Sequence, residues 1–255
     1  MPQTKINGID LYYETHGQGP AIVFAHGGGG SHLSWWQQVP ALSKNYQCVT
    51  FDHRGFGLSH EIPDGPGAAA FVEDLRGLLD HLGIEQAAVV GQSMGGWTVL
   101  GFAATHPHRT RALVLCDTTA GMDDPDVRAE QDRIPQRAAG GLIPKAFAAD
   151  FAQREPALHF LYQEINQLNR PPDKLLAALF GLRFKVEPLI EHRIPTLLVW
   201  GDQDLLIPPS TMELMSRRIP HARTAMVRGG GHSVYFEKGS EFNSILMEFL
   251  RTQLV

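Results

Sequence analysis

The chain has 255 residues, of which 43% are hydrophobic and 19% are charged, and its net charge is −5. This length is enough for one large α/β domain with a sizeable core. The acidic balance argues against nucleic acid or an anionic membrane surface as a partner, and no apolar run approaches the roughly 20 residues that span a bilayer. The chain does not begin with a basic segment followed by an apolar one, so we expect a cytoplasmic protein.

Seven segments have the pattern of β-strands. The first, residues 8–17, alternates between apolar and polar side chains, which predicts an antiparallel strand. The other six are short and mostly apolar throughout, as is typical of parallel strands covered on both faces. They span residues 21–27, 46–52, 87–92, 111–117, 196–202 and 222–229. Cys48 and Cys116 lie in two of these runs and are expected to be buried free thiols.

Helical patterns separate most of these strands. They cover about residues 34–44, 67–82, 95–106, 210–219 and 240–252. Such alternation of strands and helices predicts an α/β fold, with a mainly parallel sheet and helices on both of its faces.

The segment at residues 122–193 has no convincing strand pattern. Four prolines divide it into short helical stretches, namely Pro125, Pro144, Pro156 and Pro171. We interpret it as an all-helical lid, inserted between the first part of the core at residues 1–121 and the second part at residues 194–255. Its aromatic side chains are expected to form mostly lid core, Phe151 and Phe160 among them, with one or two facing a substrate.

The sequence Gly91-Gln92-Ser93-Met94-Gly95 joins a predicted strand to a predicted helix. It matches the nucleophile elbow, G-x-S-x-G, in which glycines on both sides leave room for a sharp turn that exposes the serine. A tight turn with a capping serine would have a similar pattern. A catalytic interpretation therefore needs a base, an acid and an oxyanion hole elsewhere in the chain.

A glycine-rich stretch, "AHGGGGSH" from Ala25 to His32, follows the first long apolar strand. Such a turn can bind phosphate, but this one lacks both the G-K-[ST] and the G-x-G-x-x-G patterns. We predict instead that the N–H groups of Gly28 and Met94 form an oxyanion hole, because Met94 opens the helix after Ser93. Without Ser93, a flexible loop would be the better interpretation.

Two later strand ends supply the acid and the base. In "VWGDQDLLIPP", Asp204 lies further into the loop than Asp202, so Asp204 is the predicted acid and Asp202 is expected to hold the turn. In "VRGGGHSVYFE", His232 follows a glycine run after the last strand, and it is the predicted base. The chain order Ser93, Asp204, His232 is the order expected for α/β-hydrolases.

The chain resembles the α/β-hydrolase superfamily over essentially its whole length except the lid. The motifs that carry the resemblance are His26-Gly27-Gly28, "DHRGFGLS" at 52–59, Gly91 to Gly96, Gly201-Asp202-Gln203-Asp204 and Gly231-His232. Within the superfamily it is similar to small-lid esterases, enol-lactonases, cofactor-free haloperoxidases and carbon–carbon bond hydrolases.

The resemblance implies an eight-stranded sheet whose second strand is antiparallel. It also implies Ser93 as nucleophile, His232 as base and Asp204 as acid, with Gly28 and Met94 as oxyanion donors. Arg54, in the "DHRGFGLS" loop, is expected to anchor neighbouring loops.

Two features of this sequence complicate the assignment of roles from the family pattern. Many relatives have a bulky residue after His-Gly, whereas this chain has Gly28-Gly29-Gly30, which predicts a smaller pocket wall. Asp117 ends its own strand, where some relatives place the acid, and it is the second candidate for that role.

A serine nucleophile favours acyl transfer over the alkyl attack that aspartate nucleophiles perform on this fold. We therefore predict hydrolysis of a carboxylic ester or lactone of a small to medium, apolar small-molecule substrate, with no cofactor and no metal. One alternative is a carbon–carbon bond hydrolase of aromatic degradation, and another is a non-catalytic receptor for a small molecule. The sequence leaves the oligomeric state open.

Overall fold

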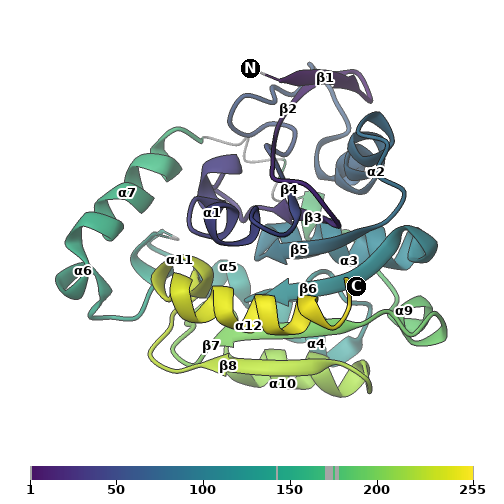
Figure 1. The fold of residues 1–255 in the computed structure, drawn as a ribbon. Helices are drawn as coiled ribbons and strands as arrows, with labels where there is room; N and C mark the ends of the chain where they lie inside the picture. The colour runs from purple at the N-terminus through teal and green to yellow at the C-terminus, as the bar shows by residue number, and fades with distance from the viewer. Residues whose placement is uncertain (1, 142, 170–174, 176–177, 255) are drawn as a thin grey trace.

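Eight strands form a single sheet in the computed structural model, which describes residues 2–141, 143–169, 175 and 178–254. Their order is β1-β2-β4-β3-β5-β6-β7-β8 (Figure 1). β2 is antiparallel to both β1 and β4, and the remaining pairs are parallel, which confirms the predicted sheet. The strands are β1 Gln3–Ile6, β2 Ile9–His16, β3 Ala21–Ala25, β4 Gln47–Phe51, β5 Ala87–Gln92, β6 Thr110–Cys116, β7 Thr196–Gly201 and β8 Arg223–Val227.

The first strand, β1, was not predicted. It pairs with β2 as a hairpin whose turn is formed by Asn7 and Gly8, both with positive φ, at 46° and 86°. Asn-Gly is the preferred sequence for such a turn, because both residues tolerate the left-handed conformation. The four residues of β1 are mostly exposed, so they lack the apolar run that marks β3 to β7.

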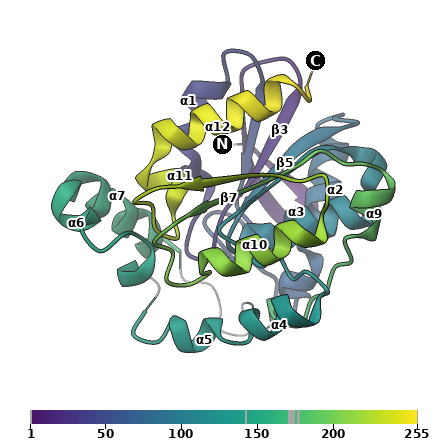
Figure 2. The ribbon, with the colours of Figure 1, turned by 90° about the horizontal axis from the view of Figure 1, so that it is seen from below.

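Helices cover both faces of the sheet, as predicted (Figures 1 and 2). α1 and α12 lie on one face, and α2, α3 and α10 lie on the other. Neighbouring residues of β5 show why its sequence is apolar throughout: Val89 packs with α2 and α3, whereas Val90 packs against the opposite layer. The helices of the core are α1 Gln38–Leu42, α2 Phe71–His81, α3 Met94–Thr105, α10 Pro209–Arg218, α11 Val234–Glu237 and α12 Gly239–Arg251.

One predicted helix is shorter than expected. The pattern over residues 34–44 is divided into a 3-10 turn, η1 His32–Trp35, and the short helix α1. Pro40 accounts for the break. In the interior of a longer helix, Pro40 would lack the N–H that the helix needs there, and its ring would clash with the preceding turn. In the first turn of α1 no such N–H is required. Further 3-10 turns are η2 Gly67–Ala70, η3 Pro107–Arg109 and η4 Ile143–Lys145.

Residues 122–193, called the insertion below, connect β6 to β7. Their described helices are α4 Pro125–Gln131, α5 Ile134–Arg137, α6 Phe151–Arg154, α7 Pro156–Gln167 and α9 Glu187–Glu191. Pro125 and Pro156 each stand at the start of a helix, as proline prefers, while Pro171 lies outside the described residues. α6 and α7 lie beyond the end of the sheet at which the parallel strands finish (Figure 1). The division of the chain into a core and a lid stays a prediction.

None of the helices in the described part of the chain combines the length and the apolar character needed to cross a membrane.

Candidate active site

Ser93 occupies a strained turn between β5 and α3. Its backbone angles are φ 48° and ψ −117°, a conformation that a residue with a side chain rarely adopts. A Cβ on Gly91 would overlap the carbonyl oxygen of Gly95, and a Cβ on Gly95 would overlap that of Ala25. The two glycines therefore permit the close packing that holds Ser93 in this turn, as the elbow motif predicts.

A chain of hydrogen bonds joins Ser93, His232 and Asp204. The Ser93 Oγ lies 3.0 Å from His232 Nε2, and His232 Nδ1 lies 2.8 Å from Asp204 Oδ2. These residues follow β5, β8 and β7, whose carboxyl ends meet at one edge of the sheet. The structure thus brings the three predicted residues together, although 139 positions separate Ser93 from His232 in the chain.

The second oxygen of Asp204 is held by the backbone. Oδ1 accepts hydrogen bonds from the N–H groups of Leu206, at 2.7 Å, and Ile207, at 2.9 Å. Because these donors use Oδ1, Oδ2 remains directed at His232. Burial lowers the pKa of His232, but the charge and hydrogen bond of Asp204 together with the charge of Asp117 outweigh burial, so the pKa is raised above its ordinary value of 6.5.

The other two aspartates near these strand ends have different contacts. Asp202 Oδ1 accepts a hydrogen bond of 2.7 Å from Gly229 N–H, so it joins the turn after β7 to the turn after β8. Asp117 accepts one of 3.0 Å from Gly201 N–H and a weaker one of 3.2 Å from the Cys116 thiol. Burial, followed by repulsion from Asp204, raises the pKa of Asp117 well above its ordinary value. Asp117 therefore lies near the site without a hydrogen bond to His232.

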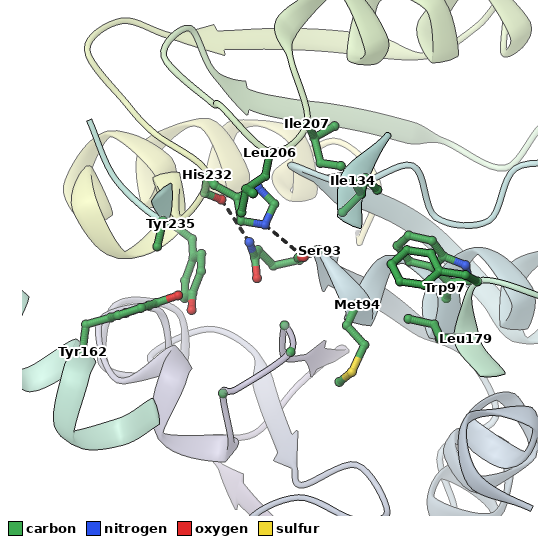
Figure 3. Close-up of a pocket in the computed structure, with 16 residues that line it drawn as sticks. Ser93, Met94, Trp97, Ile134, Tyr162, Leu179, Leu206, Ile207, His232 and Tyr235 are labelled. Carbon is green, nitrogen blue, oxygen red and sulfur yellow. Dashed lines mark hydrogen bonds between the residues drawn. The ribbon is translucent and has the colours of Figure 1, made fainter. Parts of the chain in front are cut away.

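A mainly apolar pocket opens beside Ser93. Figure 3 shows Trp97, Leu179 and Ile134 on one side of Ser93, and Tyr162 and Tyr235 on the other. The lining residues are Gly27, Gly28, Gly30, Gln92, Ser93, Met94, Trp97, Ile134, Ala146, Tyr162, Leu179, Phe180, Leu206, Ile207, His232 and Tyr235. The space open to the centre of a water molecule is about 90 Å³.

The two predicted oxyanion donors both line this pocket. Met94 is the first residue of α3, where backbone N–H groups have no acceptor within the helix. The ring of His26, two residues before Gly28, holds this loop through two hydrogen bonds. Nδ1 donates to the Gly27 carbonyl at 2.8 Å, and Nε2 accepts from His53 N–H at 3.0 Å. Burial lowers the pKa of His26 to about 4, which keeps this ring neutral, and the two hydrogen bonds set its tautomer.

The "DHRGFGLS" loop next to this site is held by Arg54. Its fully buried guanidinium donates to both carboxylate oxygens of Asp74, at 2.5 and 2.7 Å, and to Glu61 at 3.0 Å. These contacts confirm the anchoring role expected for Arg54.

Several contributors to the site were not predicted individually. Gln92 donates from Nε2 to the His232 carbonyl at 2.9 Å. The position of Gln92 inside the elbow motif is the sequence feature from which this contact could have been predicted.

In the insertion, Phe151 is fully buried as expected, but the expectation for Phe160 was wrong, because it is 62% exposed on α7. Among the described residues, no three His, Cys, Asp or Glu side chains are arranged to hold a metal ion.

Comparison with known proteins gives consistent matches over nearly the full chain. The model of a family described as "alpha/beta hydrolase fold" matches residues 20–173 and 127–239. A protein from Caulobacter sp. strain K31 named "Putative carbamate hydrolase RutD" is 30% identical, over 94% of this chain and 95% of its own.

Two solved structures illustrate the likeness in three dimensions. A thermophilic esterase from Thermogutta terrifontis is 29% identical, with a TM-score of 0.83 and complete coverage of both chains. An enol-lactonase from Burkholderia xenovorans LB400 is 27% identical, with a TM-score of 0.82 over 98% of this chain and 100% of the other.

Proposed function

Because the chain belongs to the α/β hydrolase fold family, we propose that it is a serine hydrolase that cleaves a carboxylic ester or lactone. The observation that carries this proposal is the hydrogen-bonded series Ser93–His232–Asp204, which begins at a strained elbow and opens onto an apolar pocket. This arrangement has the three roles that acyl transfer needs, namely a nucleophile, a base and a group that orients the base.

In the proposed reaction, His232 Nε2 takes the proton of Ser93 Oγ as the oxygen attacks the substrate carbonyl. The N–H groups of Gly28 and Met94 stabilise the resulting oxyanion. Protonated His232 then gives its proton to the leaving alcohol oxygen, and an acyl-enzyme forms on Ser93. Water repeats the sequence, with His232 again as base, and releases the acid.

The pocket favours a small, neutral acyl group. Apart from His232, none of its described lining residues is titratable near neutral pH, and most are apolar. A substrate carboxylate would lose its hydration there without gaining an ion pair. Relatives named as carbamate hydrolases and a neighbour named as an enol-lactonase widen the set of carbonyl compounds that we propose to test.

We further propose that the insertion acts as a lid. It supplies five residues to the pocket wall: Ile134, Ala146, Tyr162, Leu179 and Phe180. A lid in this position would exclude bulk water from the acyl-enzyme and select the substrates that enter.

The test combines a covalent probe with a substrate panel. A fluorophosphonate is expected to label Ser93 and to abolish turnover, and Ser93→Ala is expected to abolish both. Ser210→Ala is the matched control, because Ser210 is exposed and does not line the pocket.

The panel contains neutral esters, lactones, carbamates and vinylogous diketones of matched size. Turnover of esters or lactones supports the proposal. Turnover of the diketones alone would replace it with carbon–carbon bond hydrolysis. Binding without turnover of any compound would indicate a receptor.

A further inference from the structure

Glu237, the last residue of α11, places a buried carboxylate between the His232 loop and the insertion. Its side chain is 0% exposed. Oε2 accepts hydrogen bonds from Gly231 N–H at 2.9 Å and from Ala148 N–H at 3.1 Å. Oε1 accepts one of 2.7 Å from Arg154. One carboxylate therefore binds the residue that precedes His232 and two residues of the insertion.

The residue that follows His232 is also bonded to the insertion. Ser233 N–H donates to the Ala146 carbonyl at 2.6 Å, and the hydroxyl groups of Ser233 and Tyr162 lie 3.0 Å apart. A Cβ on Gly231 would overlap the backbone of Phe147 and Ala148, so only glycine permits this approach. Both chain neighbours of His232 are thus held against residues 146–148.

A buried carboxylate is unfavourable unless donors compensate for its lost hydration. Glu237 has three such donors, and bonds to an ionised acceptor are shorter and stronger than neutral ones. The Gly231 bond therefore restrains the backbone next to His232, as does the bond from Gln92 to the His232 carbonyl, while among the described residues the ring is hydrogen-bonded to Asp204 and Ser93.

We propose that Glu237 is a positioning residue, which holds the His232 backbone so that Nε2 meets Ser93 Oγ. This inference rests on the proposed function of the Ser93–His232 pair. Glu237 touches no reacting atom and acts through the N–H of Gly231. A displacement of about 1 Å in a catalytic group can cost on the order of a hundredfold in rate, so loss of this restraint is expected to lower kcat more than to raise KM.

Two conservative variants of Glu237 distinguish the effect of its hydrogen bonds from the effect of its charge. In Glu237→Gln the carbonyl oxygen can take the place of Oε2 and accept from both Gly231 and Ala148. Glu237→Asp keeps the charge, but its shorter side chain cannot reach both N–H groups. We expect kcat and the rate of fluorophosphonate labelling to fall about 100-fold in the Asp variant, with KM changed less than about threefold, and to fall less than about tenfold in the Gln variant.

The control is Asp150→Asn. Asp150 is exposed and pairs with Nη1 of Arg154 at 3.3 Å, whereas Glu237 binds Nη2, so loss of the Asp150 charge is expected to leave both rates unchanged. Melting temperatures of all variants are measured first, and rates are taken well below them. If the Asp variant retains the wild-type kcat, or if the Gln variant is the slower of the two, the positioning role is wrong.

Amide hydrogen exchange of residues 231–233 supplies a readout that needs no turnover. Exchange is expected to be faster in Glu237→Asp than in Glu237→Gln, and equal exchange in both variants would overturn the positioning role even if hydrolysis is normal. If the wild type is neither labelled nor active while exchange follows the expected order, the proposed function fails and the restraint by Glu237 stands.

Discussion

Asp204→Asn removes a charge from the proposed site while it preserves the shape of the side chain. The Asp204 Oδ1 position accepts hydrogen bonds from Leu206 and Ile207 N–H, so the asparagine carbonyl must occupy it. The amide NH₂ then faces His232 Nδ1, which can accept its hydrogen only when unprotonated. The ring proton moves to Nε2, and Nε2 can no longer accept the proton of Ser93.

The expected cost follows from this change of tautomer. The analogous substitution in a serine protease triad lowers kcat by about 10⁴, which corresponds to about 5.5 kcal/mol at 1.36 kcal/mol for each factor of ten. We expect a loss of about 10³ to 10⁴ in kcat for the best ester of the panel, with little change in melting temperature, because asparagine keeps both backbone bonds.

Asp117→Asn is the matched control for this experiment. Burial and the charge of Asp204 raise the pKa of Asp117 well above its ordinary value, so asparagine keeps the shape of this side chain and removes a charge that its surroundings disfavour. Its carbonyl can still accept from Gly201 N–H. We expect less than about a tenfold loss of kcat. A mild effect of Asp204→Asn together with a severe effect of Asp117→Asn would refute the assignment of the acid.

The pH profile and the insertion give two further predictions. The ratio kcat/KM is expected to rise with pH through a pKa above 6.5, because neutral His232 is the base and Asp204 raises its pKa despite burial; a pKa at or below 6.5, or a flat profile, would contradict this. Phe151→Ala should cost about 3–5 kcal/mol in unfolding free energy by denaturant titration, because the ring is fully buried and stacked on Phe147 at 4.2 Å. The exposed Phe160→Ala should stay within about 0.5 kcal/mol, and equal losses would refute this packing.

The sequence by itself determined the elements whose signals are local. Mostly apolar runs predicted the central strands β3 to β7, because a covered parallel strand buries both faces, as Val89 and Val90 of β5 show. The elbow around Ser93 was also predictable, because its shape depends on glycines within two residues of it. The Asn7-Gly8 turn carried a similar local signal for the β1–β2 hairpin, although the short, exposed β1 did not.

Only the tertiary structure decided which side chains meet across long distances in the chain. Asp117 and Asp204 both follow strands, but only Asp204 has its free oxygen directed at His232, since the Asp117 carboxyl binds Gly201 and Cys116. The contact between Glu237 and Ala148 spans 89 positions and has no periodic or motif signal. Such contacts depend on how the insertion packs against the strand ends, and that packing results from many weak interactions that no single stretch of sequence contains.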